Sequence, residues 1–237
     1  MNEQNPVVVL VHGAFAESGG WNAVIERLLR RSAEVVAVAN PLRSLPGDAA
    51  YVRDVIAGIG KPVVLVGHSY GGSVITEAAA HHDTVKGLVY VCAFAPDHGE
   101  SAFELASKRP GSTLGEALVT YPLGIRGNEL SIGRDAFHRQ FAADVPAAQA
   151  ALMCATQRPV AQLALMTGLP THTPAWKTLP SWFAFGDEDL NIPIAVHRYM
   201  ARRANAVCTR EVAGASHALS ISAPDAVTAA IIEALDA

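Results

Sequence analysis

Apolar residues gather along this chain in short runs rich in β-branched side chains, and helix-type spacing fills much of the sequence between them. Runs that are apolar throughout are typical of strands covered on both faces of a sheet. Six runs are expected to be strands: 6–11, 34–38, 63–66, 85–91, 181–185 and 207–212. Helices are expected over 21–31, from 46 to 58 or 60, and over 73–81, 193–204 and 224–235.

This alternation predicts an α/β fold, with a mainly parallel sheet of about six strands and helices on both faces. Sheets of this kind bind ligands just outside the carboxyl ends of their strands. The stretch 96–178 breaks the pattern, because it offers helical pieces and turns with little strand character. We expect it to form a helical cap, inserted after the fourth strand of a core domain made of 1–95 and 179–237. Ser101 and Glu104 form a capping-box sequence within it.

The third apolar run leads directly into a Gly-x-Ser-x-Gly sequence centred on Ser69. A helical pattern follows, so this serine lies between a strand and a helix. In that setting a serine is held on a sharp, exposed bend as a nucleophile. Gly67 and Gly71 agree with this, because such a bend brings backbone segments too close together for side chains. The competing interpretation is a serine that caps a helix or forms an ordinary turn.

A nucleophilic serine needs a base, and the base needs a carboxylate that orients it. His217 follows the last predicted strand, and three acidic residues follow the fifth: Asp187, Glu188 and Asp189. The order of serine, acid and histidine predicts a catalytic triad. The chemistry of the residues alone leaves the choice between Asp187 and Asp189 open.

Backbone amides are expected to hold the oxyanion that an acyl transfer generates. One donor is the amide of Tyr70, directly after the nucleophile, and the other comes from the loop after the first strand. We expect that second donor to be Ala14, with Phe15 as the next candidate. His12 is interpreted as a structural residue of the same loop, and the side chain of His68 is expected to point away from the reaction.

Composition says more about the partners of the protein than about the reaction it catalyses. A net charge of −4 over 237 residues indicates no surface for nucleic acid or an anionic membrane. No apolar run is long enough for a transmembrane helix, and the opening MNEQNP is unlike a secretory signal, so we expect a cytoplasmic protein. The three cysteines are widely spaced and the histidines lack metal-binding spacing, so no disulfide framework, metal or cofactor is expected. The sequence leaves a homodimer open.

Four sequence segments give the chain a resemblance to a known family: VVLVHGA with Trp21 a few residues on, VVLVGHSYGG, LVYVCAFAPD and GDEDLNIP. The chain resembles the α/β-hydrolases. Within them it resembles the branch that holds plant methylesterases, hydroxynitrile lyases and bacterial carboxylesterases, including pyrethroid-type esterases. The likeness covers 6–97 and 179–237 and is faint in the cap.

The resemblance implies which acid serves the triad. The family pattern Gly-x-x-Asp-x-x-x-Pro falls on Gly186, Asp189 and Pro193, which selects Asp189. The resemblance also favours an esterase. The lyases of this branch carry a threonine at the position of Gly13 and a lysine at that of Ala218, and the missing lysine removes the cation that would stabilise departing cyanide.

These residues predict a serine hydrolase that cleaves a small to medium, largely apolar carboxylic ester through an acyl-enzyme. Ser69 would attack, and His217, oriented by Asp189, would transfer the protons. Side chains expected to line the substrate pocket are Phe15, Phe94, Phe137, Phe141 and Met166. The alternatives are a hydroxynitrile lyase, a cofactor-free perhydrolase or haloperoxidase on the same triad, and a small-molecule receptor without enzymatic activity.

Overall fold

A six-stranded, all-parallel sheet forms the centre of the computed structural model, which describes residues 5–80, 82–124 and 127–237. Its strand order is β2-β1-β3-β4-β8-β9. The strands are β1 (Val7–Val11), β2 (Val35–Val38), β3 (Val63–His68), β4 (Val85–Val91), β8 (Ser181–Gly186) and β9 (Cys208–Val212). All residues of β1 and β3 are buried, as expected for strands covered on both faces.

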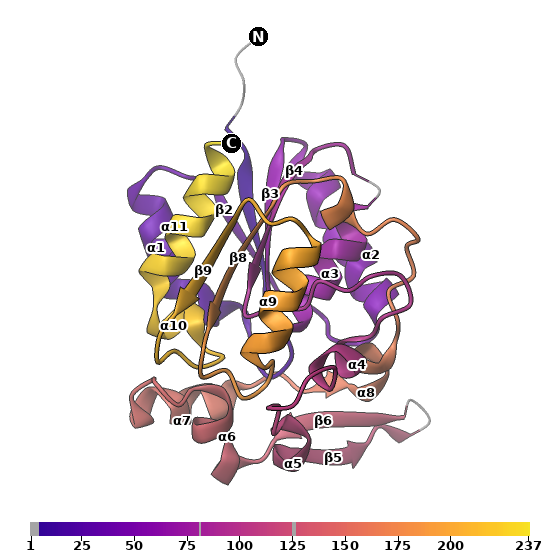
Figure 1. Cartoon of the computed structure of the whole chain (residues 1–237), viewed down its shortest axis with the longest axis vertical. Coiled ribbons are helices and arrows are strands. Elements are labelled where there is room, and N and C mark those ends of the chain that lie inside the picture. Colours follow the sequence, from indigo (N-terminus) through magenta and orange to yellow (C-terminus); the bar gives the residue numbers. More distant parts are fainter. Residues whose placement is uncertain (1–4, 81, 125–126) are drawn as a thin grey trace.

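Helices cover both faces of this sheet (Figure 1). α1 and α11 pack together on one face, and α2 and α3 pack together on the other. The long helices are α1 (Asn22–Arg30), α2 (Leu45–Ile59), α3 (Tyr70–Ala79), α9 (Ile194–Arg203) and α11 (Pro224–Leu235), with the short η1 (Ser18–Trp21), η3 (Ala175–Lys177) and α10 (Leu219–Ser222) between them. The predicted fold class is confirmed, and α3 begins three residues earlier than its sequence pattern indicated.

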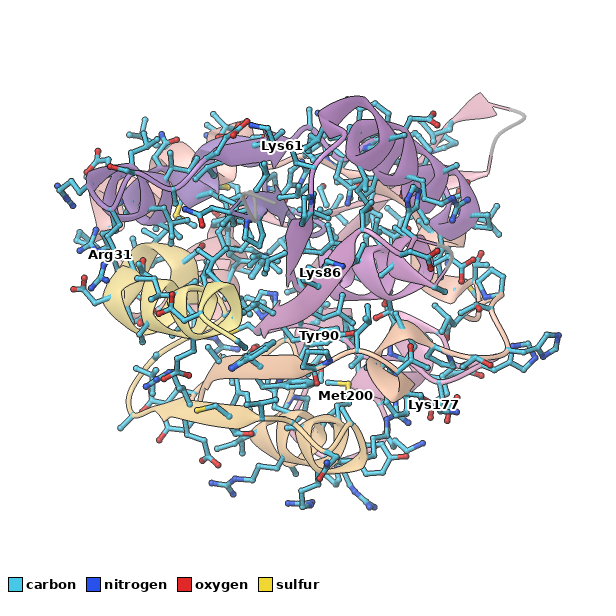
Figure 2. All side chains as sticks on the ribbon, turned by 90° about the horizontal axis from the view of Figure 1, so that it is seen from above. Arg31, Lys61, Lys86, Tyr90, Lys177 and Met200 are labelled. Carbon is cyan, nitrogen blue, oxygen red and sulfur yellow. The ribbon has the colours of Figure 1, made fainter. Side chains whose placement is uncertain are left out.

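The hydrophobic core fills the space between the sheet and the helices. Figure 2 views it from the end opposite the cap, where Tyr90 of β4 and Met200 of α9 are labelled; both are fully buried. Tyr90 stacks on Phe183 of β8 at 4.6 Å, and its hydroxyl hydrogen-bonds to that of Thr76 at 2.8 Å. None of the helices in the described part of the chain is long and apolar enough to cross a bilayer.

Between β4 and β8 the chain forms a cap beyond the carboxyl ends of the strands (Figure 1). Its elements are α4 (Ala102–Ala106), α5 (Leu114–Ala117), β5 (Leu118–Pro122), β6 (Asn128–Ile132), α6 (Arg134–Phe141), α7 (Ala147–Thr156), β7 (Val160–Ala161) and α8 (Gln162–Met166). The capping box of Ser101 and Glu104 is confirmed. Beside its helices the cap holds an antiparallel sheet, β5-β6-β7, which the sequence did not predict. Most of β5 is exposed and β7 is very short, so neither carries a buried, alternating strand pattern.

The turn from β3 into α3 leaves no room for side chains at two of its glycines. A Cβ on Gly67 would lie 2.6 Å from the carbonyl oxygen of Gly71, and a Cβ on Gly71 would lie 2.3 Å from that of Val11. Real Cβ atoms essentially never approach backbone within 3.0 Å. The two glycines therefore let β1, β3 and α3 meet closely enough to build the bend that carries Ser69.

We expect Gly71→Ala to lower the free energy of unfolding by about 2 kcal/mol or more, because the Val11 carbonyl is backbone and cannot move aside cheaply. Gly58→Ala is the matched control. Gly58 lies in α2, and its added Cβ meets nothing within 4 Å, so this change should stabilise the protein by about 0.5–1 kcal/mol. Urea denaturation measures both. Equal effects of the two substitutions would contradict the close packing at the bend.

Candidate active site

Ser69 sits on a strained bend between β3 and α3. Its φ of 54° and ψ of −124° are rare for a residue with a side chain. The backbone around it is fixed, because its carbonyl oxygen accepts hydrogen bonds from the amides of Gly72 and Phe94. Its own amide donates to Val91. This is the sharp strand–turn–helix geometry that the sequence predicted, with the serine at its apex.

His217 and Asp189 meet beyond the ends of β8 and β9. The Nδ1–H of His217 donates to Oδ2 of Asp189 at 2.7 Å, and both residues are buried. Because Nδ1 carries the proton, Nε2 is the nitrogen with a free lone pair. That Nε2 is buried and has no hydrogen-bond partner among the residues described. An imidazole in this state is suited to accept a proton.

A hydrogen bond joins the loop of His217 to the bend of Ser69. The Nε2–H of His68, next to Ser69, donates to the backbone carbonyl of His217 at 3.0 Å, and the two imidazole rings lie 4.7 Å apart. Burial and the neighbouring His217 lower the pKa of His68 to about 3, so its ring is neutral at physiological pH. His68 therefore holds the two segments together and does not act as a base. His12 is also engaged locally, since its Nδ1–H donates to the carbonyl of Gly13.

The carboxylate of Asp189 has further donors. Its Oδ1 accepts the backbone amides of Asn191 and Ile192 at 2.8 and 2.9 Å, and its Oδ2 also accepts Nε2–H of His197 at 3.1 Å. Burial alone raises the pKa of this carboxyl. The His217 imidazole and the hydrogen bonds from His197 and His217 outweigh burial and hold the pKa well below its usual range. Asp189 is thus an ionised, buried carboxylate.

The structure distinguishes Asp189 from its acidic neighbours. Asp187 and Glu188 are exposed, and Asp187 accepts a hydrogen bond from the amide of Gly214. Sequence reasoning missed His197, which lies one turn into α9 with its ring stacked on Phe185 at 4.7 Å. No motif marks such a residue, because only the packing of α9 against β8 brings it to Asp189.

The expected oxyanion donors lie beside Ser69. Ala14 and Tyr70 border the same cavity as Ser69. Tyr70 begins α3, where backbone amides lack partners within the helix. The amide of Phe15 is engaged, because it donates to the carbonyl of Arg158 at 3.0 Å. The geometry therefore favours Ala14 over Phe15 as the second donor.

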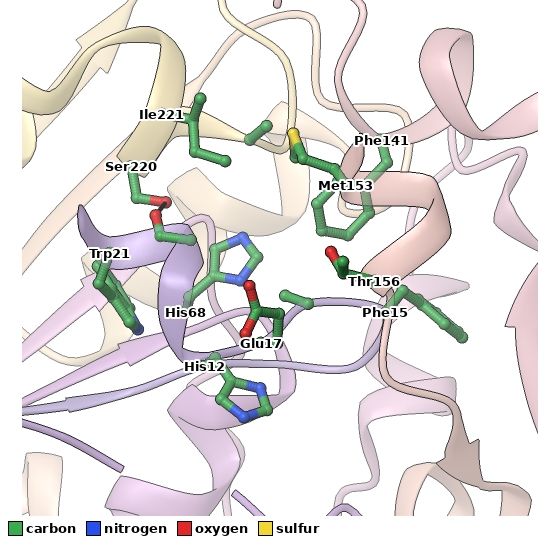
Figure 3. A pocket seen from close by; sticks show the side chains of 13 residues that line it. His12, Phe15, Glu17, Trp21, His68, Phe141, Met153, Thr156, Ser220 and Ile221 are labelled. Carbon is green, nitrogen blue, oxygen red and sulfur yellow. Dashed lines mark hydrogen bonds between the residues drawn. The ribbon is translucent and has the colours of Figure 1, made fainter. Parts of the chain in front are cut away.

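That cavity has a volume of about 360 Å³ and lies between the core and the cap. Phe15 and Phe94 line it, as expected from the sequence. The other three candidates lie elsewhere: Phe141 borders a separate, smaller cavity of about 40 Å³, Phe137 is buried against Phe141, and Met166 is 54% exposed. Figure 3 shows the smaller cavity, with His68 and Phe141 on its walls. Ser69 borders only the larger of these two.

Cys92, Asp189 and His197 form a group whose donor atoms lie within 4.8 Å of one another, which is the spacing of a metal site. Burial raises the pKa of the Cys92 thiol, and a protonated thiol is a poor ligand. Nε2 of His197 already donates to Oδ2 of Asp189 at 3.1 Å, so these two atoms are bound to each other. We therefore interpret His197 as part of the support of Asp189 and Cys92 as a buried thiol whose Sγ–H lies against the carbonyl of Ser216.

The chain is similar to known proteins both in sequence and in fold. The sequence profile of the alpha/beta hydrolase family matches residues 8–230. The alpha/beta hydrolase nvfD of Aspergillus novofumigatus is 30% identical over 94% of this chain and 93% of its own length. The pyrethroid hydrolase of Sphingobium wenxiniae is 27% identical over 97% of this chain and 88% of its own. The crystal structure of polyneuridine aldehyde esterase has the same fold, with a TM-score of 0.82 at 21% identity over 97% of this chain and 99% of that one.

We expect His197→Leu to destabilise the protein by about 1.5–3 kcal/mol at pH 7.5, because Asp189 loses a hydrogen bond to a charged acceptor. The difference in unfolding free energy between the wild type and the variant should become smaller below pH 6.5. Burial lowers the pKa of His197 from 6.5, so in acid the unfolded wild-type chain binds a proton at His197 that the folded chain does not. This proton uptake lowers the stability of the wild type as the pH falls. The leucine variant has no such group and keeps its stability. Urea denaturation at pH 7.5 and 5 measures this difference, with the exposed His172→Leu as control. A difference that stays constant or widens in acid would overturn this role.

Proposed function

The chain belongs to the alpha/beta hydrolase family, and from that premise we propose that it is a serine esterase with Ser69, His217 and Asp189 as its catalytic triad. One observation carries the proposal: the buried hydrogen bond of 2.7 Å from His217 to Asp189, in a loop tied to the strained bend of Ser69. The names of the relatives, a pyrethroid hydrolase among them, support the same reaction class.

In this mechanism Oγ of Ser69 attacks the ester carbonyl carbon while Nε2 of His217 takes its proton. The amides of Ala14 and Tyr70 donate to the oxyanion of the tetrahedral intermediate. His217 then gives the proton to the departing alkoxide, and the acyl group stays on Ser69. A water molecule, deprotonated by His217, attacks the carbonyl carbon of the acyl-enzyme. The bond from that carbon to Oγ of Ser69 then breaks, His217 returns the proton to Oγ, and the carboxylic acid is released. Asp189 remains ionised throughout and stabilises the imidazolium that forms twice in each cycle.

The cavity beside Ser69 favours a small to medium, largely apolar ester. Its volume of about 360 Å³ is at the lower end of the range of ligand pockets. Most of its walls come from apolar side chains, including Phe94, Leu130, Leu165 and Ile192. Arg109 brings a charge to the wall, and it is exposed to solvent.

Two positions argue against the cleavage of cyanohydrins. Ala218, directly after His217, is buried and apolar, so no cation stands there for a leaving cyanide. A Cβ at Gly13 would lie 2.6 Å from the carbonyl oxygen of His68, so this backbone has no room for the threonine of the lyases. Perhydrolysis would use the same triad with peroxide in place of water, and a receptor would need no nucleophile. The strained conformation of Ser69 supports an enzyme over a receptor.

Ser69→Ala should reduce kcat for p-nitrophenyl acetate by about 1,000-fold or more, because the acyl-enzyme cannot form. A fluorophosphonate probe should label the wild-type enzyme on the peptide that holds Ser69 and should leave the variant unlabelled. Ser131→Ala, in β6 of the cap, is the matched control and should keep wild-type turnover and labelling. Turnover by Ser69→Ala at the wild-type rate would end the proposal.

A further inference from the structure

Asn191 combines burial with a place on the wall of the large cavity: it is 2% exposed and borders the same space as Ser69. Nearly all its polar atoms are in use. Its backbone amide donates to Asp189, and its backbone carbonyl accepts the hydroxyl of Ser112 at 3.0 Å. Its side-chain Oδ1 accepts Nε2–H of Gln140 at 2.8 Å. The remaining atom is Nδ2, with two N–H bonds and no hydrogen bond to any residue in the described ranges.

The orientation of this amide is fixed by its neighbours. Nε2 of Gln140 also donates to the backbone carbonyl of Leu190 at 2.9 Å, and Oε1 of Gln140 accepts the hydroxyl of Thr113 at 2.8 Å. Turning the Gln140 amide around would set its oxygen against the Leu190 carbonyl, so its nitrogen must stay on that side. The oxygen of Asn191 must then face Gln140. Nδ2 is consequently the atom of this amide turned away from Gln140, in a residue that borders the cavity.

The other polar side chains on this cavity wall have roles or partners of their own or face solvent, and the hydroxyl of Tyr70 donates to Asp48. Ser69 is the nucleophile, and the hydroxyl of Ser112 donates to Asn191. The hydroxyl of Ser107 donates to the backbone carbonyl of Phe103, and Arg109 is exposed to solvent. Nδ2 of Asn191, in a residue that is 2% exposed, is therefore the donor on this wall, without a partner among the described residues, that a bound molecule would supply with an acceptor.

We propose that Nδ2 of Asn191 binds an acceptor oxygen of the substrate, and that the preferred esters carry an ether or carbonyl oxygen in addition to the ester group itself. The inference rests on the proposed esterase function. The Ala14 and Tyr70 amides bind the reacting carbonyl, so Asn191 binds a second oxygen atom elsewhere in the substrate. An alkyl ester of the same length would cover this amide with methylene groups and leave it unpaired, so it should react more slowly.

Matched ester pairs test this. In the acyl series, p-nitrophenyl butanoate, pentanoate and hexanoate are compared with the methoxyacetate, 3-methoxypropanoate and 4-methoxybutanoate, which replace one methylene by oxygen. In the alcohol series, butyl acetate is compared with 2-methoxyethyl acetate and pentyl acetate with 3-methoxypropyl acetate. For each pair, the ratio of kcat/KM is measured in the wild type and in Asn191→Leu. Dividing the two ratios cancels the intrinsic reactivity of the esters.

At one or more oxygen positions the oxygen preference should fall about 3- to 10-fold in Asn191→Leu, which is the worth of one hydrogen bond between neutral groups. Thr113→Val is the matched control. It removes the outer hydrogen bond of the same network and leaves the Asn191 amide in place, so it should keep the wild-type ratios. If Asn191→Leu changes no ratio in either series while the alkyl esters still react, the inference fails and the esterase proposal stands. If the wild type cleaves none of these esters, both fail.

A measurement on the intact side chain covers the case in which Asn191→Leu does not fold. In ¹⁵N-labelled Ser69→Ala protein, binding of the preferred oxygen-containing ester should shift one asparagine side-chain amide signal. The N–H protons of this amide should move downfield with the oxygen-containing ester, because they gain an acceptor, and should not move downfield with the alkyl partner. Scalar correlations from the Asn191 side-chain amide to its own Cβ and Cα in ¹³C,¹⁵N-labelled Ser69→Ala protein assign the signal without a second substitution. Equal shifts with both esters, or no shift with either, would overturn the role of Asn191.

Discussion

The arrangement of this molecule depends on the hydrogen bonds that satisfy the buried carboxylate of Asp189. A buried charge is tolerable only when it is fully hydrogen-bonded, and here two imidazoles and two backbone amides surround it. These donors come from the loop after β8, from α9 and from the loop after β9. Three segments must therefore be in place together before the charge is satisfied. The same set of hydrogen bonds therefore stabilises this region and orients His217.

The loop after β8, which carries Asp189, also binds the cap to the core. Asn191 and Leu190 accept hydrogen bonds from Gln140 of α6, and the hydroxyl of Ser112 reaches the Asn191 backbone. A shift of the cap would thus disturb the residues next to Asp189, and the shape of the cavity is linked to the support of the carboxylate. The cavity wall that the cap contributes is thereby held in place by the loop that carries Asp189.

The fold and the bend that carries the candidate nucleophile could be predicted because their signals are local. A buried parallel strand is apolar at every position, as in β1 and β3, and the bend at Ser69 needs glycines at fixed offsets. The remaining features depend on contacts between distant residues. His197 reaches Asp189 only because α9 packs against β8, and Gln140 meets Asn191 from another element. The antiparallel sheet of the cap escaped prediction because β5 lies mostly in solvent. Phe137 and Met166 were predicted to line the substrate pocket. The packing of the cap instead buries Phe137 and leaves Met166 exposed.

The pairing of β4 with β8 joins Leu88 to Ser181, and the whole cap lies between them in the chain. During translation at about 5–20 residues per second, β4 therefore waits on the order of ten seconds before its neighbour leaves the ribosome. Its apolar edge, with open N–H and C=O groups, can recruit a strand from another nascent chain in that interval. The yield of native protein should consequently depend on chaperones that shield this edge, even though the finished sheet conceals it completely.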